Sequence, residues 1–248
     1  MTHPQPEVLT SSEGMEKPMT FLVDHLTSRI GSEIRSDMET LLSGRHARAI
    51  RDLLEHRGVV VKADYLQGTV EWHFDGFSDD VPTFVSMLSA RALSATGGQT
   101  EFANAYAAFD ELPDSDKARL TKLRVVHTMA ANQRNVHPNP SAAHRAAWAQ
   151  FPEKTHPLVW NHRSGRKSLL LGASASHIVD MDPSEGRRLL DRLIAWATQP
   201  RFVYQHAWSL GDLVMWDNTG LLHRVQPYPA DSGRLMHRVT LVGEEAIA

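Results

Sequence analysis

The stretch EWHFDGF, residues 71–77, places His73 and Asp75 two positions apart, directly after an alternating run of polar and apolar residues. On a β-strand, residues i and i+2 point to the same face, so this imidazole and this carboxylate would lie side by side. Both groups bind metal ions, but such a pair also occurs by chance on a solvated sheet face. The pair alone therefore favours the ordinary interpretation.

A third candidate ligand comes much later, in the stretch WDNTGLLHRV, which places His223 on an apolar predicted strand. Taken alone, His223 is best interpreted as a hydrogen-bonded strand residue. Two imidazoles and one carboxylate on a β scaffold, however, form a facial triad, which leaves open coordination positions and is typical of non-haem Fe(II) oxygenases. We therefore predict an Fe(II) site made by His73, Asp75 and His223, with no catalytic residue beyond these ligands.

Two arginines follow in the stretch SGRLMHRVTL. Arg234 and Arg238 are separated by an even number of residues, so on a regular strand both face the same way. A buried guanidinium needs an anionic partner, and arginine suits carboxylates particularly well. Salt bridges within the barrel wall are the plain interpretation. Beside an iron site, the pair would also suit a 2-oxo diacid whose distal carboxylate meets an arginine.

Composition limits the class of protein. The chain has 248 residues, 42% of them hydrophobic, a net charge of −3 and no cysteine. The polar, proline-containing N-terminus predicts a flexible tail over residues 1–18, and the length predicts one domain over residues 19–248. The lack of cysteine rules out a disulfide or a thiolate metal site. These values do not indicate a nucleic-acid or membrane partner, and no signal peptide is evident. We expect a cytoplasmic homo-oligomer.

Many short predicted strands with few helices indicate a mainly β fold with flanking helices, of the sandwich or jelly-roll kind. Apolar spacing predicts helices over 36–58 and over 183–200, the latter capped by Ser184. Strands are predicted over 68–74 and 202–218, and a long irregular insertion over 131–157. Five histidines in or near the insertion are interpreted as mostly solvated, with a lid over the site as the alternative; they are His127, His137, His144, His156 and His162.

Several segments resemble the 2-oxoglutarate-dependent taurine dioxygenase and 2,4-dichlorophenoxyacetate dioxygenase family. In the family's order, over most of residues 69–243, they are WHFDGF, TGGQTEFANAYAAFDELP, SGRKSLLLGASASHIVDM, EGRRLLDRLIAWATQPRFVYQHAWSLGDLVMWDN, LLHR and RLMHRVTLVG. The resemblance implies a double-stranded β-helix (jelly roll) that binds Fe(II) through His73, Asp75 and His223.

The same resemblance implies how two ligands bind. Thr100 and Arg234 match the residues that hold the distal carboxylate of 2-oxoglutarate, and Arg238 matches an arginine that faces an acidic group of the prime substrate. Such an enzyme uses O₂ to hydroxylate a C–H bond of a small acidic substrate, such as an aryloxyalkanoate or a sulfonate, and releases succinate and CO₂. The hydroxylated product falls apart if a heteroatom adjoins the new hydroxyl.

One feature departs from the family. Only KADYLQG lies between Val61 and Thr69, where family members usually carry several tens of residues over the substrate pocket. Either the pocket is trimmed or a stretch is missing, and the abrupt change of character predicts a break between Val61 and Lys62.

Two rival functions stay open. A metal hydrolase with His and Asp ligands explains the triad, but it does not explain Thr100 with Arg234. A non-catalytic jelly-roll binding protein explains the fold, but it leaves the three ligands without a use.

Overall fold

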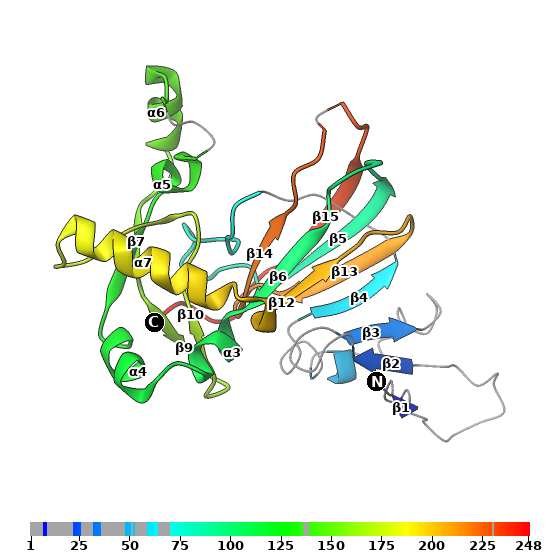
Figure 1. Ribbon diagram of the computed structural model, residues 1–248, viewed down its shortest axis with the longest axis horizontal. Helices are drawn as coiled ribbons and strands as arrows, with labels where there is room; N and C mark the ends of the chain where they lie inside the picture. Colours follow the sequence, from blue (N-terminus) through cyan, green and yellow to red (C-terminus); the bar gives the residue numbers. More distant parts are fainter. Residues whose placement is uncertain are drawn as a thin grey trace.

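The computed structural model describes residues 7–8, 22–25, 32–35, 48–50, 52, 59–63, 70–135, 139–229 and 231–248 (Figure 1). Of the predicted tail, Glu7 and Val8 form strand β1, and the rest lies outside these residues. Most of the helix predicted over 36–58 also lies outside them, although residues 48–50 and 52 are helical.

Two mainly antiparallel sheets make the framework of the site. The larger sheet, in spatial order, consists of β1 (Glu7–Val8), β2 (Leu22–His25), β3 (Ser32–Arg35), β4 (Val59–Ala63), β13 (Asp212–Asp217), β5 (Val85–Ala92) and β15 (Leu235–Leu241). The smaller sheet consists of β12 (Val203–His206), β6 (Thr100–Asn104) and β14 (Leu221–Val225). Every pair in them is antiparallel except β3 with β4.

The two sheets face each other across one apolar cluster. Val214 and Met236 of the larger sheet pack with Phe102 and Leu221 of the smaller one, each at most 2% exposed. Inward residues alternate along these strands, as expected when one sheet face is buried. This arrangement confirms the prediction of a mainly β jelly roll.

Helices cover a second, larger core beside the sheets. They are α3 (Ala105–Asp110), α4 (Asp114–Leu120), α5 (Met129–Gln133), α6 (Ala142–Trp148) and α7 (Pro183–Ala197), with a short 3₁₀ turn, η1 (Pro200–Phe202). The strands there are β7 (Arg124–His127), β8 (Lys154–Pro157), β9 (Val159–Asn161), β10 (Lys167–Leu169) and β11 (Ala175–Ile178). In Figure 1, α7 crosses in front of these strands, while α5 and α6 project from them. Among the described residues, no helix is long and apolar enough to cross a membrane.

Helix α7 follows its predicted pattern, with a different cap. Leu189, Leu190 and Leu193 are buried on one face, at the spacing of an amphipathic helix. The N-cap is Asp182, whose side chain accepts hydrogen bonds of 3.0 Å from the backbone N–H groups of Ser184 and Glu185. The prediction of Ser184 as the cap is wrong, because the aspartate two residues earlier already satisfies these groups.

Two further predictions are wrong in an informative way. Residues 68–74 do not form a strand where described; His73 makes a single isolated bridge to His223, and the carbonyl of Trp72 instead accepts from Ala173 N at 2.8 Å. The insertion over 131–157 is not irregular throughout, because it holds the end of α5 and all of α6 and β8. Thr128 starts α5 by accepting from Ala131 N at 3.0 Å.

The strand predicted over 202–218 is two strands in different sheets, β12 and β13. Between them Gly211 adopts a positive φ of 93°, which favours glycine, and Asp212 N donates to Ser209 O at 3.1 Å. The turn moves the chain from the smaller sheet to the larger one.

The junction of Val61 and Lys62, where the sequence predicts a break, lies inside a strand. Strand β4 runs through this junction, with Val61 opposite Val214 and Lys62 opposite Leu213. Residues 64–69, which lead from β4 toward His73, lie outside the described residues.

Candidate metal centre

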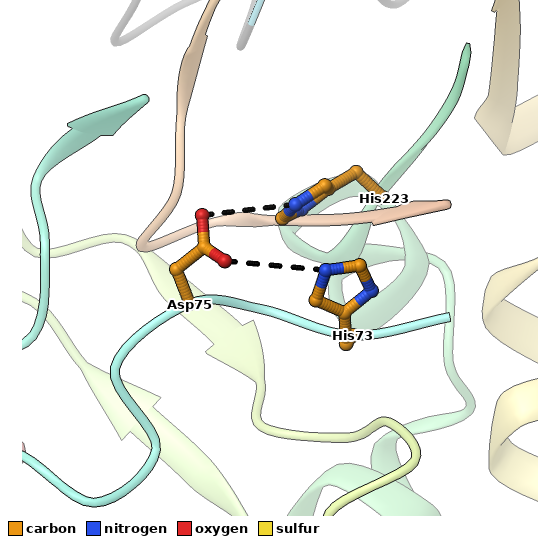
Figure 2. A group of neighbouring side chains, drawn as sticks. All are labelled: His73, Asp75 and His223. Carbon is orange, nitrogen blue, oxygen red and sulfur yellow. Dashed lines mark ion pairs between the residues drawn. The ribbon is translucent and has the colours of Figure 1, made fainter. Parts of the chain in front are cut away.

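The structure brings His73, Asp75 and His223 together at β14, the edge strand of the smaller sheet (Figure 2). One nitrogen or oxygen atom of each lies within 4.8 Å of the others. His73 Nε2 is 3.9 Å from Asp75 Oδ1, and His223 Nε2 is 3.7 Å from Asp75 Oδ2. A small inward movement of the three side chains would place each ligand atom roughly 2.0–2.2 Å from a metal ion bound between them, the usual distance for nitrogen and oxygen ligands.

Backbone pairing fixes the two histidines opposite each other. His73 N donates to His223 O at 3.0 Å, and His223 N donates to His73 O at 2.8 Å. His73 Nδ1 lies 2.7 Å from the carbonyl oxygen of Glu71. Because a carbonyl can only accept, Nδ1 carries the proton and Nε2 keeps its lone pair for a metal.

Asp75 is held by both its backbone and its side chain. Asn218 donates to Asp75 O and accepts from Asp75 N, both at 2.8 Å. Ser86 donates its hydroxyl to Asp75 Oδ2 at 2.8 Å, and the Arg238 guanidinium forms an ion pair with the same oxygen. The carboxylate is therefore fixed in orientation before any metal binds.

The charges of the three side chains suit a divalent cation. Burial alone would raise the pKa of Asp75, but His223, Arg238 and His73 together hold that pKa well below its ordinary value, so the side chain is a carboxylate. Burial lowers the pKa of His73 and of His223, so both imidazoles are neutral at pH 7. One anion and two neutral imidazoles form the donor set of a facial triad, and these residues fit an iron ion.

Arg234 lies just before β15 and is 8% exposed. Its Nη2 donates to Gly98 O at 3.1 Å, its guanidinium lies 4.7 Å from the centre of the Tyr228 ring, and its Nη1 has no partner among the described residues. Burial lowers the pKa of Arg234, which Tyr228 partly offsets. A Cβ on Gly98 would lie 2.9 Å from Arg234 Nε, so glycine leaves the room that this arginine occupies.

Thr100, the other predicted co-substrate residue, begins β6 and is 2% exposed. Its hydroxyl accepts a hydrogen bond of 3.0 Å from Trp208 Nε1. Trp208 and Arg234 both line a cavity of about 160 Å³, together with Gly98 and Gln99. Thr100 is thus hydrogen-bonded to a residue that lines the same cavity as the arginine.

Arg238 lies on β15, two residues after buried Met236. Its ion pair is with Asp75, so the anionic partner is a candidate metal ligand and not a residue of the barrel wall.

Sequence reasoning missed Ser86 and Trp208. The alternation of β5 offered a signal for Ser86, which lies on the face of buried Leu88. For Trp208, the signal was the Ser-Leu-Gly-Asp run after it, which favours a turn.

The structure corrects the prediction for the histidines in or near the insertion. His127, His156 and His162 are 0%, 5% and 7% exposed, so the interpretation as solvated residues is wrong for them. Each has an internal hydrogen bond, to Ser174 Oγ, Phe77 O and Ser168 Oγ respectively. His137 and the side chain of His144 lie outside the described part of the chain.

A jelly roll in which two histidines and one aspartate converge defines a class of protein: a double-stranded β-helix with a candidate facial-triad metal centre. Residues 61–240 match the model of the Taurine catabolism dioxygenase TauD, TfdA family, and the chain belongs to this family.

Named relatives agree with this assignment. The chain is 42% identical over 173 residues to the alpha-ketoglutarate-dependent 2,4-dichlorophenoxyacetate dioxygenase of Burkholderia sp. (strain RASC). The aligned residues make up 69% of this chain and 58% of the relative. It is 36% identical over 187 residues to the (S)-phenoxypropionate/alpha-ketoglutarate-dioxygenase of Sphingobium herbicidovorans. Here the aligned residues make up 73% of this chain and 65% of the relative. The matched region thus spans about three fifths of the length of these relatives.

A solved structure gives the same fold. The crystal structure of AAD-2 in complex with Mn(II) and N-oxalylglycine superposes with a TM-score of 0.83 at 31% identity, covering 92% of this chain and 100% of that one.

Proposed function

We propose that the protein is an Fe(II)- and 2-oxoglutarate-dependent dioxygenase. It hydroxylates a C–H bond of a small acidic substrate, such as an aryloxyalkanoate or a sulfonate, and releases succinate and CO₂. The observation that carries the proposal is the convergence of His73, Asp75 and His223 in the same fold as a buried arginine, Arg234, with an unpartnered nitrogen. A set of metal ligands and the unpaired guanidinium of Arg234 together suit a co-substrate that has a metal-binding end and a distal carboxylate.

The three ligands have the task of holding Fe(II) with open positions. The iron, with 2-oxoglutarate and O₂, supplies the oxidising power that no protein side chain has. Glu71 keeps His73 in the tautomer that presents Nε2, and Asn218 fixes the Asp75 backbone. Phe102 and Trp216, whose rings lie 6.5 Å and 4.7 Å from that of His223, keep water from this side of the site.

Arg234 and Thr100 have the task of binding the distal carboxylate of 2-oxoglutarate. The free Nη1 of Arg234 is a buried charged donor, and leaving such a group unpaired is costly. A carboxylate from the co-substrate would satisfy it with a charge-assisted hydrogen bond.

Arg238 has the task of binding an acidic group on the prime substrate. Its guanidinium lies at Asp75, next to the metal centre, and its side chain is 36% exposed, so an incoming anion can reach it. The named relatives act on a dichlorophenoxyacetate and a phenoxypropionate, which are both carboxylates.

The rival functions have less support. A metal hydrolase leaves the unpartnered cation of Arg234 unexplained, and a binding module leaves the buried ligand set without a use. A homo-oligomer, a cytoplasmic location and the absence of a nucleic-acid partner stay predictions.

The test is substrate-dependent succinate formation. The protein is supplied with Fe(II), 2-oxoglutarate and O₂ and is screened against aryloxyalkanoates, sulfonates and alkyl sulfates. We expect turnover with at least one acid, which Asp75→Ala abolishes and Asp79→Ala, an exposed aspartate on the next turn, leaves unchanged. Hydrolysis of an ester without 2-oxoglutarate would instead support the hydrolase.

A further inference from the structure

We propose that Trp208 is a positioning residue, which sets the Thr100 hydroxyl as a hydrogen-bond donor to the distal carboxylate of 2-oxoglutarate. This inference rests on the proposed function, because it assigns a second layer of residues to the same co-substrate site.

The direction of the Trp208–Thr100 hydrogen bond is unambiguous. An indole nitrogen can only donate, so Thr100 Oγ1 is the acceptor in the 3.0 Å contact with Trp208 Nε1. The single hydroxyl proton of Thr100 then points elsewhere, and no described residue accepts it. A hydroxyl that accepts one hydrogen bond is also a better donor in the next one.

The surroundings say which kind of acceptor belongs there. Trp208 shares its cavity of about 160 Å³ with Arg234, whose Nη1 is another donor without a partner. Arg234 lines this cavity, and Thr100 is hydrogen-bonded to Trp208 in the cavity wall. An unsatisfied cation and an unsatisfied hydroxyl donor together call for an anion with two acceptor oxygens. A carboxylate fits this description.

Trp208 is itself held in place from the other side. His206 packs edge-on against its ring, with centroids 4.6 Å apart. Asp212 fixes His206 Nε2 at 2.9 Å and also accepts from Ser209 N at 2.7 Å. The turn between β12 and β13 therefore presents the indole N–H to Thr100 in one orientation.

The test measures binding and not turnover. Binding of 2-oxoglutarate to the Mn(II)-loaded protein is followed by calorimetry without O₂, for the wild type, Trp208→Phe, Thr100→Val and the double variant. A second titration uses 2-oxopentanoate, which keeps the metal-binding end but lacks the distal carboxylate. Trp196→Phe is the matched control, because it also removes an indole N–H bond, to Ala108 O, far from the site.

We expect Trp208→Phe to weaken 2-oxoglutarate binding by about three- to tenfold, the size of one neutral hydrogen bond. Binding of 2-oxopentanoate should not change, and the effect should vanish in the Thr100→Val background. If Trp208→Phe folds poorly, benzothienylalanine at position 208, which replaces the N–H with sulfur in the same ring shape, carries the same expectation.

Three results would overturn the inference. Equal weakening of both 2-oxo acids would show that Trp208 only supports the fold. If Trp208→Phe weakens 2-oxoglutarate binding as much in the Thr100→Val background as in the wild type, Trp208 does not act through the Thr100 hydroxyl. A wild type that binds 2-oxopentanoate as tightly as 2-oxoglutarate would overturn the proposed co-substrate, and this inference with it.

Discussion

Arg234 and Arg238 lie four residues apart, yet the structure gives them different neighbours. Arg234 is buried against Gly98 and Tyr228, whereas Arg238 reaches out to Asp75. Two cations four residues apart can therefore serve two different anions, one on the co-substrate and one on the prime substrate.

This difference predicts separable effects of the two arginines. Arg234→Ala should raise the apparent KM for 2-oxoglutarate about ten- to a hundredfold, since hydrogen bonds to charged groups contribute about 1.5–3 kcal/mol. Arg238→Ala should instead spare 2-oxoglutarate decarboxylation without substrate but lose the preference for acidic over neutral substrates. The measurement is steady-state succinate release with varied co-substrate and with matched acid and ester substrates.

Arg119→Ala, which removes an exposed arginine near Glu185, is the control and should change neither property. Equal effects of the Arg234 and Arg238 variants on 2-oxoglutarate alone would contradict the assignment of Arg238.

At this scale the sequence was most informative where residue type and chemistry coincide. His73, Asp75 and His223 are few, have metal-binding side chains and lie in recognisable stretches, so they could be predicted without a fold. Ser86 and Trp208 could not, because a serine or a tryptophan gains its role only from the strand register and turn that place it.

At the scale of single elements, helix α7 allows a direct test of its start. Asp182→Ala should lower the free energy of unfolding by about 1 kcal/mol, the usual cost of removing an N-cap side chain. Ser184→Ala should cost less, because the Ser184 hydroxyl donates to the same carboxylate and caps no backbone group. Urea unfolding of the three proteins measures the difference, and a larger loss from Ser184→Ala would restore the sequence-based assignment.

Strand β7 carries a buried histidine that should make stability depend on pH. Burial lowers the pKa of His127 from 6.5 to about 3 in the folded protein. The unfolded chain thus takes up a proton below pH 6.5 that the folded protein does not, so stability is full above pH 6.5 and falls as the pH decreases toward 3. The loss at pH 5 should be about 2 kcal/mol, at about 1.4 kcal/mol per unit.

Urea unfolding at pH 7.5 and pH 5.0 measures this loss. His127→Gln should reduce the loss by about 2 kcal/mol whatever its own effect on stability. His177→Gln, at an exposed position, is the control and should show the same loss as the wild type. An unchanged loss in His127→Gln would show that other groups cause the dependence.

Elements with a long apolar pattern could be predicted, and those defined by distant partners could not. Helix α7 follows from its own residues. The segment before His73 alternates like a strand, but its partners are His223 and the backbone at Gly172 and Ala173, so only one bridge forms. Nothing local to the segment reveals this.

At the scale of the whole molecule, the candidate metal centre joins two apolar cores. Trp72 and Phe74, which flank His73, belong to the helix-covered core. Leu221, on the strand of His223, belongs to the core between the sheets, whereas its neighbour Leu222 belongs to the first. A metal ion bound to the three ligands would therefore tie both cores together.

Metal binding should raise thermal stability accordingly. At a free Mn(II) concentration of about 100 times Kd, binding to the folded state adds about 2.7 kcal/mol, which corresponds to a rise in Tm of roughly 5–10 °C for a chain of this size. Differential scanning calorimetry with Mn(II) and with a chelator measures the shift. Asp75→Ala should abolish it and Asp79→Ala should keep it, whereas a shift that survives Asp75→Ala would place the metal elsewhere.

The general architecture was predictable from the many short strands and from the family resemblance. The way in which the sheets share one core, and the extra core under α7, depends on packing between segments far apart in the sequence. Periodicity along the chain carries no information on such pairing.

The reciprocal hydrogen bonds between His73 and His223 also impose an order on biosynthesis. Ribosomes lengthen a chain at roughly 5–20 residues per second, so the second histidine emerges many seconds after the first. A nascent chain offers one imidazole and one carboxylate, too few ligands to retain iron, until β14 has been made and paired. An oxygen-reactive metal would therefore enter only a finished pocket, and a growing polypeptide would be spared the oxidative damage of a half-built centre.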